Sequence, residues 1–295
     1  MNGQVLIRLL LLLASLLWLS ACSGLSGCCS SRLPGADLPA GSIVEVASGR
    51  LLDMDELVEL LAAPQMVLLG EKHDNPEQHE LQLQLLQALE QRRVQGSLVL
   101  EMLNGNQQPN VDRVRADLAA GNPPAQLTDA LDWDPGWDWQ LYGPLVEHAI
   151  TRPWPLLAGN LDGQQMRAVY RNPSALKSAH AGHPGVQRRL RRIIHDSHCG
   201  LLPRKQLPAM LAVQQQRDLN MARTLLDADK PAMLIAGSYH VRKDLGVPLH
   251  LQDLTDDPGF VILIMLEEGS SYGQGMADYV WYTTAAEERD YCADL

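Results

Sequence analysis

The chain is poor in cysteine, and this shortage limits how its fold can be held together. It has five cysteines in 295 residues, and three of them, Cys22, Cys28 and Cys29, precede the part that is expected to fold. A disulfide framework is therefore excluded as the main source of stability. An oxidising compartment would permit a bridge between Cys199 and Cys292, but the sequence does not show whether they are close in space.

Positive charge is also scarce. The chain has 24 Lys and Arg against 35 Asp and Glu, a formal net charge of −11. An acidic surface repels polyphosphates and anionic headgroups, so this balance argues against nucleic acid and against electrostatic binding to anionic lipid. We expect no nucleic-acid partner, and contact with a membrane by a lipid anchor only.

The apolar run at the start, Leu9 to Leu19, is too short to cross a membrane comfortably. The residues after it, Leu19-Ser20-Ala21-Cys22, resemble the bacterial lipoprotein signal, in which the cysteine is lipidated. We expect residues 1–21 to be a signal peptide and Cys22 to carry acyl chains, palmitate among them, which anchor the protein stably in the periplasm. The residue after this cysteine is Ser23 rather than Asp, which resembles the pattern that sorts lipoproteins to the outer membrane. The alternative is an ordinary secretory signal with a chance cysteine.

The rest of the chain divides by composition. Residues 22–40 are rich in Ser, Gly and Pro, which is typical of a flexible tether. The remainder is long enough for one sizeable core with an inserted subdomain.

Short apolar runs alternate with helical patterns after residue 41. The runs are residues 66–69, 97–100, 154–158, 232–236 and 260–266. This alternation predicts an α/β fold with a largely parallel sheet flanked by helices.

Helices are predicted from Leu51 to Ala62 and, with Asn75 as N-cap, from Pro76 onward. Residues 164–226 are helix-like without a good strand, so we expect a smaller all-helical insertion domain there. The α/β domain then consists of residues 41–163 and 227–295.

Polar residues follow most of the predicted strands. Glu71 and His73 follow the first, Glu101 the second, Asn160 the third, and Ser238-Tyr239-His240 the fourth. Ligands of open parallel sheets bind beyond the carboxyl ends of the strands. The sequence therefore predicts a functional pocket at this edge, whereas residues 75–77 are explained by helix capping.

A second polar group lies in the helical segment. His195, His198 and Cys199 stand at i, i+3 and i+4, so a helix would place them on one face. Metal binding, contact with a ligand, and packing or a disulfide all remain open for this group. Trp133, Trp137 and Trp139 are expected in the core or at a dimer surface.

Six blocks of the sequence are distinctive when they are taken together and in order. They are VLLGEKHDNPEQHELQLQLLQAL, LEMLN, LDWDPGWDWQLYGPLVEHA, DSHCGLLP, QQQRDLNMARTL and GSYHVRKDLGVPLHL. Together they resemble the ChaN-like haem-binding lipoproteins of iron-regulated haem uptake, within a wider group that includes Tiki/TraB-like proteases and erythromycin esterases. The match runs from about Gly41 to about Leu266.

The resemblance implies a protein that holds or transfers ferric haem and works with components of a haem-uptake system. It also implies a haem-induced homodimer in which a tyrosine of one subunit binds each iron, and a histidine and a lysine of the other hold the propionates. A phenolate is a hard anionic ligand that suits ferric iron.

The motifs do not fix which residues do this. We rank the candidate ligands of the haem iron as Tyr170, then Tyr239, then Tyr142. By position, the candidates for the propionates are His240, Arg242 and Lys243, with His73 as a further one.

The alternative function is a hydrolase, a protease or esterase like those of the wider group. In that case Glu71, His73, Glu101 and His240 would bind a divalent metal or activate water.

Overall fold

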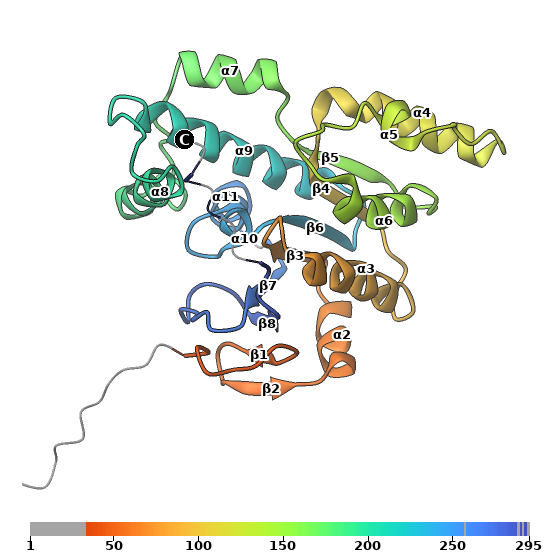
Figure 1. The fold of residues 1–295 in the computed structure, drawn as a ribbon, viewed down its shortest axis with the longest axis horizontal. Coiled ribbons are helices and arrows are strands. Elements are labelled where there is room, and N and C mark those ends of the chain that lie inside the picture. The colour runs from red at the N-terminus through yellow and green to blue at the C-terminus, as the bar shows by residue number, and fades with distance from the viewer. Residues whose placement is uncertain (1–33, 257, 288–289, 291, 294–295) are drawn as a thin grey trace, which may run out of the picture. The chain divides into compact units, whose positions relative to one another are not determined.

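The computed structural model describes residues 34–256, 258–287, 290 and 292–293 (Figure 1). The expected signal peptide, the lipidation site Cys22 and the tether as far as Leu33 lie outside these residues. Within the described part, no helix is both long enough and apolar enough to cross a membrane.

One eight-stranded sheet organises the chain, in the order β2-β1-β8-β7-β3-β6-β4-β5 (Figure 1). The six strands from β8 to β5 run parallel, and only β1 and β2 at one edge are antiparallel. The prediction of an α/β fold with a largely parallel sheet is confirmed. The strands are β1 (Ile43–Glu45), β2 (Arg50–Leu52), β3 (Met66–Glu71), β4 (Ser97–Asn104), β5 (Leu156–Asn160), β6 (Ala232–Gly237), β7 (Phe260–Glu267) and β8 (Tyr279–Thr283).

The five predicted strands correspond to β3 to β7, while β1, β2 and β8 were not predicted. The helix predicted from Leu51 begins at Met54, because Arg50–Leu52 pairs with β1 as strand β2. Asp53 then caps the helix. Its side chain accepts a hydrogen bond from the Glu56 amide, and the Glu56 side chain accepts one from the Asp53 amide.

Helices cover both faces of the sheet. Alternate strand residues point to opposite faces, so Val67 and Leu69 belong to one core and Met66 and Leu68 to the other. The first core is covered by α2 (Met54–Ala62), α3 (Pro76–Glu90) and α6 (Trp139–Ile150), and the second by α9 (Leu207–Asp227) and α11 (Val247–Leu254). Further elements are the 3-10 turn Gly105–Gln107, α4 (Gln108–Ala119), α5 (Leu127–Leu131) and α10 (Ser238–Val241).

The described chain between β5 and β6 is helical, with α7 (Gly163–Arg171), α8 (Pro184–Ser197) and α9. A small third core lies here, where Leu190 and Ile194 of α8 pack with Leu211 of α9 and with Leu245 and Leu249. By contrast, α7 has no buried residue.

Candidate functional site

The carboxyl ends of the central strands bring the predicted polar residues to one place. Glu71 at the end of β3 lies beside Gly237 at the end of β6, and Glu101 of β4 accepts a hydrogen bond of 2.7 Å from the Gly237 amide. Two clusters, one around each glutamate, form the polar side of a crevice.

Glu71 lies at the centre of the first cluster. Its Oε1 accepts hydrogen bonds from the Tyr142 hydroxyl at 2.7 Å and from His73 Nδ1 at 2.8 Å, and its Oε2 is 3.3 Å from His79 Nε2. Because Nδ1 of His73 donates to the carboxylate, its Nε2 is the nitrogen left for the crevice. A Cβ at Gly237 would lie 2.7 Å from this Nε2, so only glycine leaves the ring room there.

Burial and charge set the protonation of this cluster. Burial by itself lowers the pKa of His73, but the hydrogen bond to Glu71 and the charges of Glu101 and Glu71 outweigh it, so the pKa of His73 is raised. Burial and the adjacent Glu71 carboxylate raise the pKa of Tyr142 far above the ordinary value of a phenol. The Tyr142 hydroxyl is therefore held protonated.

Glu101 is the centre of the second cluster. Its Oε1 is 2.5 Å from Arg217 Nη2 and 3.3 Å from His240 Nε2. His240 Nδ1 in turn lies 2.5 Å from Asp218, and Arg217 Nε donates to Asn160 Oδ1 at 3.0 Å. The two acids and two bases alternate, so the buried charges compensate one another.

The pKa values of this second cluster follow from that alternation. Burial would raise the pKa of Glu101, but His240 and Arg217 hold it well below its ordinary value. Burial would lower the pKa of His240, but Glu101 and Asp218 raise it to about 9. At neutral pH the imidazolium–carboxylate pairs are therefore fully formed.

Three members of this site were missed by sequence reasoning, Gln214, Arg217 and Asp218 of α9. They stand at i, i+3 and i+4, and Gln214 Nε2 lies 3.2 Å from His240 Nδ1. The sequence did offer one signal, because these three polar residues share one face of a helix. It marks the side of α9 that turns toward the ends of the strands.

The crevice is a cavity of about 840 Å³ with one polar and one apolar side. This volume is within the range of sites for cofactors. The polar side is formed by residues of the clusters, Glu71, His73, Arg217 and His240 among them. The apolar side is Leu190, Ile193 and Ile194 of α8 together with Met210 and Val213 of α9.

Two exposed tyrosines border this apolar side. Tyr239 is 50% exposed and lines the crevice, with Arg242 Cζ 6.0 Å from its ring centre. Tyr170 on α7 is 38% exposed and lines a second cavity of about 240 Å³ with Arg167 and Arg171. Met210 and Val213 line both cavities, so the two cavities, each lined by one exposed tyrosine, share one apolar strip of α9.

The structure places the other candidates less favourably. Tyr142 is 1% exposed and engaged with Glu71, which argues against it as a ligand of iron. Lys243 is paired with Asp278 and does not line the crevice. His240 lines the crevice but is buried between Asp218 and Glu101, whereas His73 and Arg242 line it with exposed atoms.

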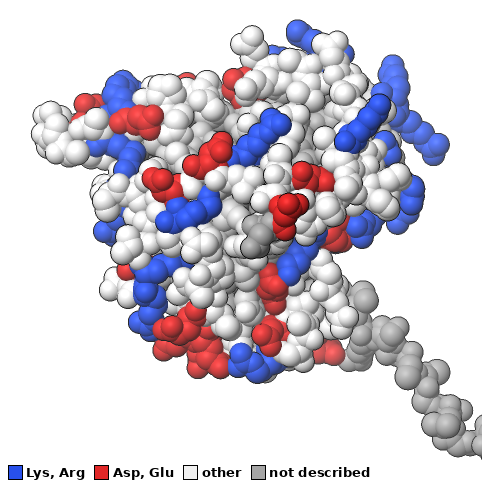
Figure 2. Space-filling model, turned by 180° about the vertical axis from the view of Figure 1, so that it is seen from behind, with Lys and Arg blue, Asp and Glu red and all other residues white. Residues whose placement is uncertain are grey.

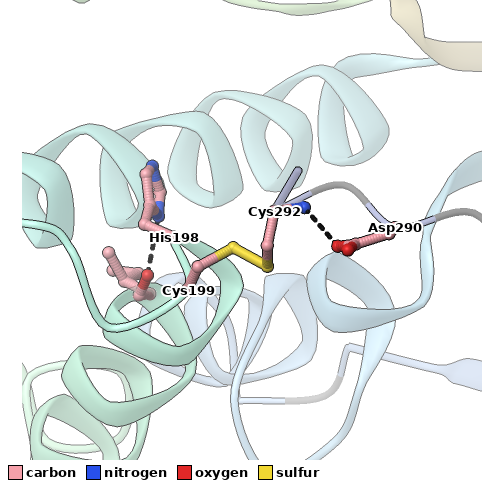
Figure 3. Close-up of a disulfide and its surroundings, with 5 residues drawn as sticks. His198, Cys199, Asp290 and Cys292 are labelled. Atoms are coloured by element: carbon pink, nitrogen blue, oxygen red, sulfur yellow. Dashed lines mark hydrogen bonds between the residues drawn. A yellow bond between two sulfur atoms is a disulfide. The ribbon is translucent and has the colours of Figure 1, made fainter. Parts of the chain in front are cut away.

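Cys199 forms a disulfide with Cys292 (Figure 3). A metal site at His195, His198 and Cys199 is thereby overturned, because the thiolate is consumed, and His198 Nδ1 bonds to the Ile194 carbonyl at 2.7 Å. Within the described residues, no group of three His, Cys, Asp or Glu side chains is arranged to hold a metal ion, at this position or in the crevice.

Comparison with solved structures finds one protein with this fold and one that is less similar. ChaN of Campylobacter jejuni, whose structure shows cofacial haem binding, superposes with a TM-score of 0.74 and 27% identity over 81% of this chain and 95% of its own. The erythromycin esterase EreC has a TM-score of 0.45 and 14% identity, over 77% of this chain and 76% of its own. The sequence matches none of the curated proteins with which it was compared.

Residues 57–251, well over half of the chain, match the family described as haem-binding uptake, Tiki superfamily, ChaN. The likeness to the solved structure of ChaN agrees with this match. The chain therefore belongs to the ChaN family of haem-binding uptake proteins, within the Tiki superfamily.

Proposed function

We propose that this protein holds ferric haem on the apolar strip of α9 and passes it on during haem uptake. One observation carries the proposal. Met210 and Val213 form a surface that is common to two cavities, and an exposed tyrosine lines each of the two. Bound haem would supply the iron that uptake delivers.

The residues present fit the three parts of a haem. The macrocycle is apolar and suits the strip and the adjoining α8 side chains Ile193 and Ile194. The propionates are carboxylates and suit guanidinium groups such as that of Arg242. The ferric ion is a hard acid and suits a phenolate.

Tyr170 is the ligand that we propose. Arg167 and Arg171 line the same cavity, so guanidinium groups stand close to this tyrosine. The tyrosine is also carried by α7, which has no buried residue, so its side chain is open to a large flat ligand. Tyr239, which lines the other cavity, is the competing candidate.

An open strip covers one face of a macrocycle and leaves the other face to water. A second copy of the chain would cover that face, and the haem in ChaN of Campylobacter jejuni is bound cofacially. We therefore propose a haem-induced homodimer. His73 and Arg242, which line the crevice with exposed atoms, are the residues placed to reach a propionate of the partner's haem.

The lipid anchor at Cys22, the location at the periplasmic side of the outer membrane and the partnership with other components of a haem-uptake system belong to the same proposal. They rest on the signal-like sequence before Ser23 and on the uptake role of the family.

Titration with hemin tests this proposal. The chain from Ser23 should give a saturable spectral change with the weak Soret band of a phenolate complex, and Tyr170→Phe should abolish that spectrum. Tyr142→Phe is the matched control, since its hydroxyl is engaged with Glu71, and it should leave the spectrum unchanged.

Two further variants in the same titration locate the haem if Tyr170 is not the ligand of its iron. Loss in Tyr239→Phe alone would assign the iron to Tyr239. Val213→Asp places a carboxylate on the shared strip and should weaken binding about 10-fold or more with either ligand, because the charge is desolvated by the macrocycle. Wild-type protein without a saturable change would overturn the proposal.

One observation favours a second candidate function. The Glu71–His73 pair orients Nε2 of the imidazole toward the crevice, as a general base requires. A hydrolase of ester or amide substrates is the activity that this pair would serve. It predicts hydrolysis of a p-nitrophenyl ester that His73→Asn abolishes, and no hydrolysis above that of His73→Asn would eliminate it.

A further inference from the structure

The acidic net charge of the chain conceals a strongly basic segment. Residues 164–226 contain 11 of the 24 Lys and Arg but only two of the 35 Asp and Glu, Asp196 and Asp218. Asp218 is buried against His240, so one acidic side chain remains for the surface of this segment. The rest of the chain carries 13 Lys and Arg against 33 Asp and Glu.

Six of these 11 cations lack acidic partners. They lie in α8 or in the loops before and after it, they form no ion pair with any residue that the structure describes, and all but Arg191 are exposed. Arg191 donates a hydrogen bond only to Gln187, which is neutral. We call this group the basic face; it consists of Lys177, Arg188, Arg191, Arg192, Arg204 and Lys205.

The fold explains why the cations of α8 are on its outer side. Val186, Leu190 and Ile194 turn the apolar side of α8 into the small third core, so Arg188 and Arg192, one helical turn apart, are left outside. Figure 2 shows Lys and Arg gathered at the upper right with few acidic side chains beside them. This is the side to which the rotation brings α7 and α8 of Figure 1.

An exposed apolar side chain accompanies the cations. Leu201, in the turn between α8 and α9, is 65% exposed, and Arg204 and Lys205 follow it in the same turn. A guanidinium group can bind two oxygens of one phosphate at once. An apolar residue among cations is typical of protein surfaces that enter the headgroup layer of a membrane. An acidic protein would satisfy the cations but gives no reason for an exposed leucine between them.

We propose that the basic face docks on an anionic lipid surface and that Leu201 inserts between its headgroups. This departs from the expectation from the net charge of the whole chain, because the charge is divided between two parts of the surface. The acidic remainder is repelled by the same lipid, so the long-range field would also orient the molecule with α8 toward the membrane.

Vesicle sedimentation tests the proposal, with the chain from Ser23, which contains every element of the fold and carries no lipid. It should bind vesicles of phosphatidylglycerol and phosphatidylcholine but not vesicles of phosphatidylcholine alone, and added salt should weaken the binding. A cation near an anionic surface contributes about fivefold to binding, so R188Q/R192Q should lower the affinity about 25-fold. L201S should lower it further.

The matched control is R50Q/R92Q, which removes two exposed cations that have carboxylate partners elsewhere. It should change the affinity less than twofold. Equal losses in the two double variants, or no binding to anionic vesicles, would overturn the proposal.

Two more measurements distinguish docking on lipid from haem binding and from self-association. Arg188 and Arg192 line neither cavity, so R188Q/R192Q should bind hemin as the wild type does, whatever the outcome with vesicles. Self-association without vesicles that R188Q/R192Q abolishes would assign the basic face to a second copy of the chain and exclude the lipid.

Discussion

Glu71 and Glu101 are almost completely buried carboxylates, and each is stabilised by partners from other parts of the chain. Glu71 draws on Tyr142, which is 71 residues away, and Glu101 on Arg217, which is 116 residues away. A buried charge costs several kcal/mol when it loses its partners. The polar side of the crevice is therefore as much a part of the folded core as the apolar clusters are.

Tyr142→Phe tests this at one atom. The substitution removes the hydroxyl that donates to Glu71 at 2.7 Å and leaves the ring in place, so unfolding should require about 2 kcal/mol less free energy. Urea unfolding measures the difference. Unchanged stability would mean that the hydroxyl contributes nothing to holding Glu71.

The pH dependence of stability should report on His240. Its pKa in the folded protein is raised to about 9 from an ordinary value of 6.5, so its contribution is complete below pH 6.5 and is lost as pH rises through about 9. The full effect is about 3 kcal/mol at 1.4 kcal/mol per pKa unit. Urea unfolding of the haem-free protein between pH 6 and 10 measures it.

His240→Gln should remove this alkaline loss of stability. Glu101→Gln should move it to lower pH, because one of the charges that raise the pKa of His240 is gone. A wild-type profile that is flat up to pH 10 would contradict the assignment.

The sequence predicted one half of each cluster. Glu71, Glu101, Asn160 and His240 follow or end apolar runs, and position at the end of a strand was enough to bring them together. Tyr142, Arg217 and Asp218 come from helices whose contact with the sheet depends on tertiary packing, which no local pattern encodes. The assignment of the iron to Tyr170 stays a prediction.

Among the elements, those at one edge of the sheet were hardest to predict. β1 and β2 have three residues each, too few for a periodic pattern to stand out. β8, with the sequence YVWYT, did carry a strand signal in its aromatic and β-branched residues. The long central strands were predicted because each is buried on both faces and is therefore apolar throughout.

The sequence did not show whether Cys199 and Cys292 form a disulfide, and the structure shows that they do. The disulfide joins the end of α8 to the last described residues across a separation of 93 residues (Figure 3). A bridge of this span restricts the unfolded chain and contributes about 4.5 kcal/mol. Reductant should lower the stability of the wild type by about that amount in urea unfolding.

The control is C199S/C292S, which should have the stability of the reduced wild type and no response to reductant. A wild type that reductant leaves unchanged would show that the bridge does not form in the protein as prepared.

At the scale of the whole molecule, we expect hemin to double the mass of the protein in solution. Because an open strip covers one face of the haem, hemin should convert the monomer to a dimer, and sedimentation velocity measures the change. Tyr170→Phe should stay monomeric at the same hemin concentration. A dimer that is equally populated without hemin would show that protein contacts alone hold the two copies together.

Helix α9 has a consequence for how a large flat ligand gains entry. This helix has 21 residues without a break, and its stretch from Met210 in the crevice wall to Leu225 in the second core is about 22 Å long at 1.5 Å per residue. In the middle of the helix, Arg217 binds Glu101 of β4 and Asp218 binds His240, which follows β6. α9 therefore cannot move without unpacking the sheet, whereas α7, which packs against α9 and borders the second cavity, has no buried residue and can move away. The backbone amides of α7 should therefore exchange their hydrogens faster than those of α9.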